Sequence, residues 1–208
     1  MGPVRIGIED CGPRRLPVYF ILDCSSVPHN GFAVAAAQQV LAVVSRLNAW
    51  AIQSREEYQS APVFYTVIVF RRQALQLQPL ASPQTYRFDD LRLGDIEPYG
   101  ERGFAAALAA LQGSIEYELK MPGADNGDEW PLVFLFTDEL PTLKLKAPTA
   151  KLFVCGIESP PKTPPSFAGL VPEFLPLESQ AQIFDKIEAA RVELKKGRQQ
   201  MIDYPTVY

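Results

Sequence analysis

The sequence predicts an α/β protein, namely a Rossmann-like three-layer sandwich with a mostly parallel central sheet of about six strands and one antiparallel edge strand. Short runs rich in β-branched and aromatic residues alternate with longer segments whose apolar residues recur at helical spacing. This alternation is typical of a parallel sheet covered by helices. The chain has 208 residues, of which 47% are hydrophobic, and this suffices for one domain of ordinary size.

We expect residues 1–13 to form an N-terminal arm, residues 14–199 a single domain and residues 200–208 a C-terminal tail. The arm is rich in Gly, Pro and Arg, whereas the regular alternation of apolar runs occupies the segment that follows. No internal repeat is evident in the sequence, so the elements are expected to build one sheet.

The first half of the domain contains three predicted strands and one helix. The run at 17–23 is apolar up to Asp23, as in a buried strand. Residues 31–54 place apolar side chains on most sides of a helix, which indicates a long helix packed on a sheet. Residues 63–70 are β-branched and aromatic and predict a second buried strand. Residues 74–80 alternate apolar with polar side chains, which indicates the antiparallel edge strand.

The second half is predicted to contain two further helices and three strands. Apolar residues at helical spacing predict a helix at 103–120. The apolar runs at 131–137 and 151–157 predict buried strands. Residues 174–177 predict a last strand at an edge of the sheet, since this run contains a proline and edge strands tolerate proline. An amphipathic helix is predicted at 180–199, with a basic end that complements its dipole.

The composition argues against several classes of protein. The net charge is −4 and no basic stripe is present, so we expect no binding to nucleic acid. The apolar runs are shorter than the ~20 residues of a membrane helix, so we expect no membrane segment. The first residues lack the apolar region of a signal peptide, and the chain has three cysteines, which together indicate reduced thiols in the cytoplasm. His29 is the only histidine, so a histidine-rich metal site is excluded.

Two predicted buried strands end in an aspartate. Asp23 follows the first strand and Asp138 follows the strand at 131–137. Ligands of open α/β sheets bind outside the carboxyl ends of the strands, so both carboxylates are expected at the functional edge. Hard cations such as Mg²⁺ take oxygen ligands of this kind.

Three stretches resemble the von Willebrand factor A domain, specifically the bacterial cytoplasmic TerY-like branch found in tellurite-resistance gene clusters. They are residues 14–26 (RRLPVYFILDCSS), 103–108 (GFAAAL) and 131–138 (PLVFLFTD). Their order and spacing are similar to that family over about residues 14–198. The resemblance implies the same three-layer fold and a metal-ion-dependent adhesion site, or MIDAS, at the carboxyl edge.

The MIDAS implied by this resemblance is degenerate. Asp23 and Ser25 match the first two positions of the family's Asp-x-Ser-x-Ser motif, and Asp138 matches its last aspartate. Val27 stands where the family has the second serine, and Arg102 stands on or next to the family's threonine, with Glu101 as the alternative within the alignment error. The site therefore lacks two of the expected oxygen ligands.

The rim of this edge comprises residues 24–31, 99–103 and 138–142, and its expected contact residues are Val27, His29, Arg102 and Glu139. Arg102 has two interpretations: its guanidinium replaces the lost cation beside the aspartates, or it is an exposed loop residue. His29 is either a contact for a partner or a solvated loop residue that helps to start the next helix.

The family resemblance favours a non-enzymatic protein–protein interaction module in the bacterial cytoplasm. Its expected partners are a paralogous von Willebrand A protein and kinase- or phosphatase-like proteins of a stress or tellurite-resistance system, and no cofactor is expected. Two alternatives remain. One is a metal-dependent domain that binds its ligand through Mg²⁺ at Asp23, Ser25 and Asp138. The other is a Mg²⁺-dependent phosphohydrolase that uses the two aspartates.

Overall fold

The computed structural model describes residues 13–25, 31–55, 59, 61–85, 103–120, 127–140, 149–157 and 172–202, with side chains described up to Lys196. The described part contains a six-stranded sheet in the order β3-β2-β1-β4-β5-β6. The strands are β1 (Leu16–Asp23), β2 (Val63–Phe70), β3 (Ala74–Gln76), β4 (Leu132–Phe136), β5 (Lys151–Cys155) and β6 (Glu173–Leu175). Every neighbouring pair is parallel except β2 and β3, which are antiparallel. The predicted fold class is confirmed.

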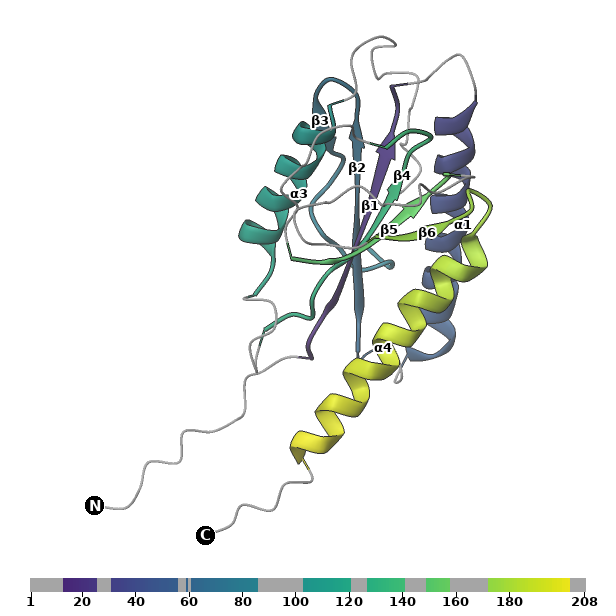
Figure 1. Ribbon diagram of the computed structural model, residues 1–208. Helices are drawn as coiled ribbons and strands as arrows, with labels where there is room; N and C mark the ends of the chain where they lie inside the picture. Colours follow the sequence, from purple (N-terminus) through teal and green to yellow (C-terminus); the bar gives the residue numbers. More distant parts are fainter. Residues whose placement is uncertain are drawn as a thin grey trace, which may run out of the picture.

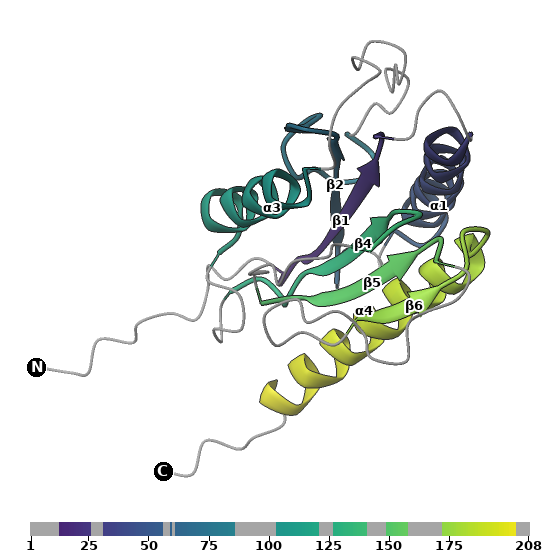
Figure 2. The same ribbon diagram turned by 45° about the horizontal axis from the view of Figure 1, so that its top comes forward.

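Helices cover both faces of this sheet (Figures 1 and 2). On one face lie α1 (Phe32–Gln53) and α4 (Gln180–Ile202), and on the other lies α3 (Phe104–Glu118). The side chains of β1 alternate between these layers, because successive residues of a strand point to opposite faces. Val18, Phe20 and Leu22 belong to the core under α1 and α4. Tyr19 and Ile21 belong to the core under α3.

The connections of β1 and β4 create the point at which ligands bind in folds of this type. From β1 the chain passes through α1 to β2 on one side, whereas β4 joins the opposite side of β1. The chain therefore extends the sheet in opposite directions from β1 and from β4. These two strands are neighbours, and their register pairs Leu22 with Phe136. The residues that follow these two strands meet at the carboxyl edge of the sheet.

Two glycines allow close packing at this edge. The Gly103 N–H donates to the carbonyl of Arg71 over 2.5 Å, and a Cβ atom on Gly103 would lie 2.3 Å from that oxygen. Gly156 has φ +106° just after β5, and a Cβ atom there would lie 2.6 Å from the ring of Phe32. These contacts place the starts of α3 and α1 directly against the ends of the strands.

Cation–π contacts, as well as hydrophobic packing, join α1 and α4 on their face of the sheet. Arg46 of α1 lies over the ring of Phe184, 3.8 Å from its centroid. Arg191 of α4 lies over Trp50 at 4.2 Å and pairs with Glu188 at 3.0 Å, although only 2% of Arg191 is exposed. Such cation–π contacts strengthen when the cation is removed from water.

The amino edge of the sheet carries a buried ion pair. Arg15 donates to both carboxylate oxygens of Asp128, at 2.8 and 2.5 Å, and the Lys120 backbone N–H donates to the same carboxylate at 2.8 Å. Asp128 is 2% exposed. The pair ties the start of β1 to the segment that leads into β4, across 113 positions of sequence.

The predicted elements agree with the structure apart from their ends. The edge strand predicted at 74–80 is shorter, because β3 ends at Gln76 and the chain then forms an isolated bridge between Ala81 and Tyr65. The last helix extends to Ile202, three residues into the segment 200–208 predicted as a tail. Its final turn continues beyond the amphipathic pattern because Arg, Gln and Met are good helix formers without burial.

By length and composition alone, α1 is long and apolar enough to cross a membrane, although no membrane segment was predicted. Core helices and signal sequences also meet these criteria, so they are weak evidence. In this fold α1 packs against β1 and α4, and its buried residues are Phe32, Ala33, Ala36, Val40, Val43, Val44, Leu47 and Ala51.

Candidate functional site

Asp23 is the central residue of the carboxyl edge. It ends β1, and none of its surface is exposed. Its Oδ1 accepts hydrogen bonds from the backbone N–H of Ser25, at 2.9 Å, and from the Ser25 hydroxyl. Its Oδ2 accepts a hydrogen bond from the hydroxyl of Thr137 at 2.8 Å. The carboxylate therefore joins the end of β1 both to the turn that follows it and to the end of β4.

Thr137 is a site residue that the sequence analysis did not identify. Its hydroxyl lies 2.8 Å from Asp23 and 2.7 Å from the carbonyl oxygen of Glu139, and its backbone N–H donates to Cys155 at 3.0 Å. The signal was present in the strand pattern. Val133 and Leu135 face α3 in β4, as Tyr19 and Ile21 do in β1, so the next odd positions, Thr137 and Asp23, share that face. The alternation of side chains along these two paired strands therefore predicts that Thr137 and Asp23 lie on the same face.

Asp138 and Glu139 follow Thr137 at the same edge. Asp138 is half-buried and Glu139 is exposed. The two aspartates predicted to converge, Asp23 and Asp138, therefore both lie at the carboxyl edge, after the neighbouring strands β1 and β4. Val27, His29 and Arg102 lie outside the described residues, so their places at the rim stay predictions.

Arg71 is the second residue that the sequence analysis did not identify. It follows β2 at the same edge, and 5% of its surface is exposed. Its backbone is satisfied, since its N–H donates to Gln73 at 2.8 Å and its carbonyl accepts from Gly103. Its guanidinium is not: Nε, Nη1 and Nη2 are all buried without a hydrogen-bond partner in the described part of the chain.

Two charged residues of this edge act on the thiol of Cys24. Burial raises the pKa of the Cys24 thiol to about 12, the positive charge of Arg71 lowers it, and the negative charge of Asp23 raises it. Burial likewise raises the pKa of Cys155 to about 12. Both thiols are therefore protonated at neutral pH, and neither supplies a thiolate for nucleophilic attack or metal binding.

The described residues do not fit a tightly bound divalent cation. No group of three or more carboxylate, imidazole or thiol side chains comes together among them. Mg²⁺ requires a near-octahedral set of oxygen ligands. Both oxygens of Asp23 accept hydrogen bonds, and the Ser25 hydroxyl donates its proton to Asp23. These two residues hold the strand end in place, which leaves too few described donors for a complete site.

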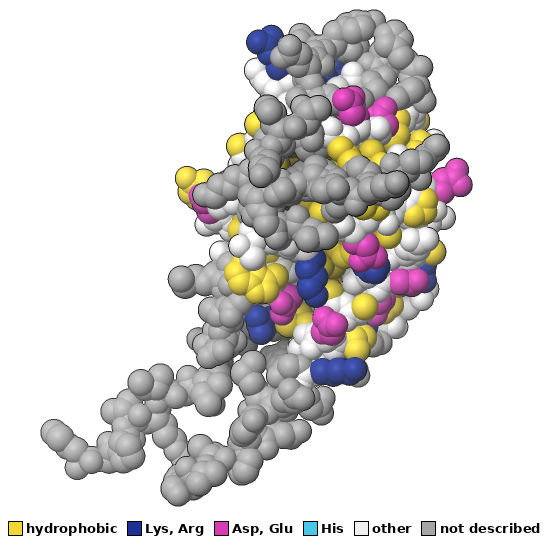
Figure 3. Space-filling view, in the orientation of Figure 1, with side chains coloured by type: hydrophobic (Ala, Val, Ile, Leu, Met, Phe, Trp, Pro, Cys, Tyr) yellow, Lys and Arg dark blue, Asp and Glu magenta, His cyan; other side chains and the backbone are white. Residues whose placement is uncertain are grey.

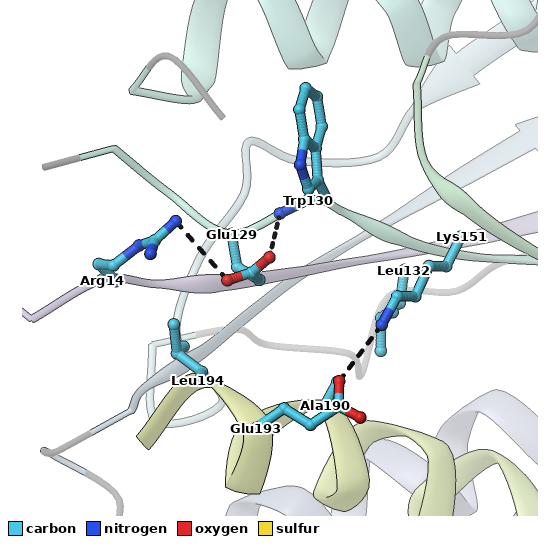
Figure 4. Close-up of a pocket in the computed structure, with 8 residues that line it drawn as sticks. All are labelled: Arg14, Glu129, Trp130, Leu132, Lys151, Ala190, Glu193 and Leu194. Carbon is cyan, nitrogen blue, oxygen red and sulfur yellow. Dashed lines mark hydrogen bonds and ion pairs between the residues drawn. The ribbon is translucent and has the colours of Figure 1, made fainter. Parts of the chain in front are cut away.

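A small cavity of about 130 Å³ lies at the opposite, amino edge, between the starts of β4 and β5 and the helix α4 (Figure 4). Trp130 is 41% exposed beside it. The charged residues of the cavity interact with one another: Arg14 lies 3.6 Å from Glu129, and Lys151 lies 3.5 Å from Glu193. These four charged side chains form two ion pairs within the chain, so none of them is available to bind a charged ligand.

Figure 3 shows one face of the molecule, on which basic and acidic side chains are interspersed. On the described part of that face no large patch of a single sign is visible.

Comparison at the level of sequence finds no match: neither a protein-family model nor a curated protein matches this chain. Comparison with solved structures does find similar folds. The PilB minor pilin from Streptococcus sanguinis matches 94% of this chain and 63% of its own length, with a TM-score of 0.51 and 10% identity. At this identity the likeness shows the fold alone.

The structural neighbours include von Willebrand A domain proteins. The ArnB paralog VWA2 from Sulfolobus acidocaldarius is 12% identical, with a TM-score of 0.45 over 70% of this chain and 35% of its own. Proximal thread matrix protein 1 from the mussel byssus, in a structure with a zinc-occupied MIDAS motif, is 14% identical, with a TM-score of 0.44 over 88% of this chain and 47% of its own. The chain thus spans about a third to a half of the length of these two von Willebrand A neighbours.

Proposed function

We propose that this chain is a non-enzymatic protein-interaction module that binds its partner at the carboxyl edge of the sheet. The observation that carries the proposal is the hydrogen bonding of Asp23. Ser25 and Thr137 occupy both oxygens of this buried carboxylate, so it acts as a brace between β1 and β4. The brace holds half-buried Asp138 and exposed Glu139 on a fixed platform.

The same arrangement argues against catalysis by the described residues. A nucleophile needs an adjacent base, which in turn needs an orienting group. Cys24 is protonated, and Asp23 already accepts three hydrogen bonds. The only histidine of the sequence, His29, lies outside the described residues. We therefore favour recognition over hydrolysis.

For the partner we propose a paralogous von Willebrand A protein of the bacterial cytoplasm, within a stress or tellurite-resistance system that also contains kinase- or phosphatase-like proteins. This part rests on the sequence resemblance to TerY-like proteins. An intact paralogue would carry the metal, and this chain would supply a scaffold or an acidic ligand. Glu139, exposed beside Asp138, is suited to the latter role.

The test is a charge reversal at the rim with a matched control. Glu139→Lys reverses a charge on the platform. Glu116→Lys makes the same reversal at an exposed position near the C-terminal end of α3. Tagged chains of both variants and the wild type are recovered from native lysate, and co-purifying proteins are quantified by mass spectrometry. We expect one set of proteins to fall roughly tenfold, about 1.4 kcal/mol, with Glu139→Lys alone. Equal recovery with all three chains would place the interface elsewhere.

The second candidate, metal-dependent ligand binding, is favoured by the convergence of Asp23, Ser25 and Asp138 at one edge. Calorimetric titration with Mg²⁺ and Mn²⁺ separates the two candidates. We expect no binding at sub-millimolar concentration in the wild type, because the described donors are too few. The double variant Val27→Ser with Arg102→Thr restores the two family ligands and is expected to gain a Mg²⁺-dependent rise in thermal midpoint. Tight binding by the wild type would instead support the second candidate.

A further inference from the structure

The carboxyl edge contains a buried positive charge for which the described residues provide no hydrogen-bonded counterion. Arg71 is 5% exposed, and all three of its guanidinium nitrogens lack a hydrogen-bond partner in the part of the chain that the structure describes. Its backbone, by contrast, is held at both ends by Gln73 and Gly103. The residue is therefore fixed in place, while the five donors of its guanidinium are unused.

Asp23 is a buried carboxylate at the same edge, but its oxygens accept hydrogen bonds from other residues. Ser25 and Thr137 donate hydrogen bonds to its two oxygens, and Arg71 does not. The positive charge of Arg71 and the negative charge of Asp23 both shift the pKa of the Cys24 thiol, but the guanidinium makes no hydrogen bond to the aspartate.

A guanidinium left unpaired in the interior is costly, because it has lost its hydration without gaining hydrogen bonds. Its planar fork matches a carboxylate, which accepts two parallel hydrogen bonds from it. Asp23 and Asp138 both lie at this edge, and their negative charges disfavour a doubly charged anion such as phosphate. The ligand that suits this site is a monovalent carboxylate.

We infer that Arg71 is a carboxylate-binding site, and that its occupant in the complex is an aspartate or glutamate side chain of the protein partner. The identity of the occupant rests on the proposed function, whereas the site itself rests on the buried guanidinium alone. Binding of this kind would add specificity to the platform formed by Asp138 and Glu139, since a partner without a carboxylate at that position would leave the charge unpaired.

The test uses the isolated full chain and sodium acetate as the probe. Thermal midpoints are measured at pH 7 in sodium acetate and in sodium chloride of equal ionic strength. Arg71→Met removes the buried charge and leaves a shorter, unbranched apolar side chain. Arg72→Met is the control, because it removes the same charge from the adjacent, exposed position. Acetate also stabilises proteins non-specifically, so the measured quantity is the difference between the variants.

We expect acetate to raise the midpoint of the wild type and of Arg72→Met by roughly 2–4 °C more than that of Arg71→Met. In chloride we expect Arg71→Met to be at least as stable as the wild type, because replacing an unpaired buried ion with an apolar side chain is neutral or stabilising. An equal response of all three chains to acetate would overturn the inference. A chloride midpoint of Arg71→Met well below that of the wild type, or failure of this variant to fold, would also overturn it, because the charge would then have its counterion within the chain.

The result is independent of the test at Glu139, because the acetate titration needs no partner protein. A null result with acetate leaves the interaction platform intact as a proposal. Conversely, if the test at Glu139 rejects the platform, a positive acetate result still supports the site at Arg71.

Discussion

At the scale of single residues, the carboxyl edge depends on hydrogen bonds to buried groups. The carboxylate of Asp23 is fully buried, and a buried charge is tolerated only where hydrogen bonds replace its hydration. Ser25 supplies two of these bonds from the following turn, and Thr137 supplies one from the neighbouring strand. The bond from Thr137 links the ends of β1 and β4, beyond the last residues of their paired ladder.

The prediction at this scale concerns Thr137. Thr137→Val keeps the shape of the side chain but removes the hydroxyl, so Oδ2 of Asp23 loses this hydrogen bond. We expect a loss of about 1–3 kcal/mol in the free energy of unfolding, measured with urea, because a buried hydrogen bond to a charged acceptor is removed. Thr137→Ser keeps the hydroxyl and should retain most of the stability. If both variants unfold at the wild-type urea concentration, Thr137 does not support Asp23.

At the scale of elements, close backbone approach positions the helices. The turn after β2 and the start of α3 meet where Gly103 donates to the carbonyl of Arg71. Further along, α3 is tied to the edge hairpin by Glu118, which accepts hydrogen bonds from Gln76 at 2.8 Å and Ser114 at 2.7 Å. The helix is therefore anchored at both ends, and its first anchor has no room for a side chain.

Gly103, which precedes α3, and Gly113 within it give a matched pair of substitutions. A Cβ atom on Gly103 would lie 2.3 Å from the Arg71 carbonyl oxygen, whereas one on Gly113 has no atom within 4 Å. We expect Gly103→Ala to cost about 1–3 kcal/mol through overpacking against backbone. Gly113→Ala should instead stabilise the protein by roughly 0.5–1 kcal/mol, since alanine is the better helix former. Urea denaturation measures both. Equal effects at the two positions would show that the contact at Gly103 relaxes freely.

At the scale of the whole molecule, the two edges of the sheet have different roles. The carboxyl edge gathers the polar residues of the candidate site, whereas the amino edge is closed by the ion pair between Arg15 and Asp128. Burial of Asp128 alone would raise the pKa of its carboxyl, but hydrogen bonds from Arg15 and from the Lys120 N–H outweigh burial, and the pKa lies below its ordinary value of 3.8. The same pairing raises the pKa of Arg15.

The pH dependence of stability follows from the sign of this shift. A carboxyl with a lowered pKa in the folded state stabilises the protein above its unfolded pKa of about 4, and this contribution disappears as the pH falls through the folded value. We expect the urea midpoint of the wild type to fall between pH 5 and pH 3 by more than that of Asp128→Asn, which lacks the contribution at every pH. Parallel pH profiles for the two chains would show that the pair contributes no linked stability.

The sequence alone determined the α/β class, the order of the elements and the placement of Asp23 and Asp138 after two buried strands. These features follow from patterns local to the chain: continuous apolar runs mark buried strands, helical spacing marks the helices, and an aspartate at a strand end marks the carboxyl edge. The edge strands predicted at 74–80 and 174–177 overlap β3 and β6, although their ends differ.

Only the tertiary structure revealed the parts played by Thr137 and Arg71. The hydroxyl of Thr137 matters because the register of β1 and β4 brings it to Asp23, across 114 positions of sequence. Arg71 stands beside an equally basic neighbour, Arg72, and nothing in the sequence distinguishes them. The fold buries the first and exposes the second. A charge acquires its chemistry from burial and from its neighbours in space, and these are set when distant strands pair, not by the residues on either side of it.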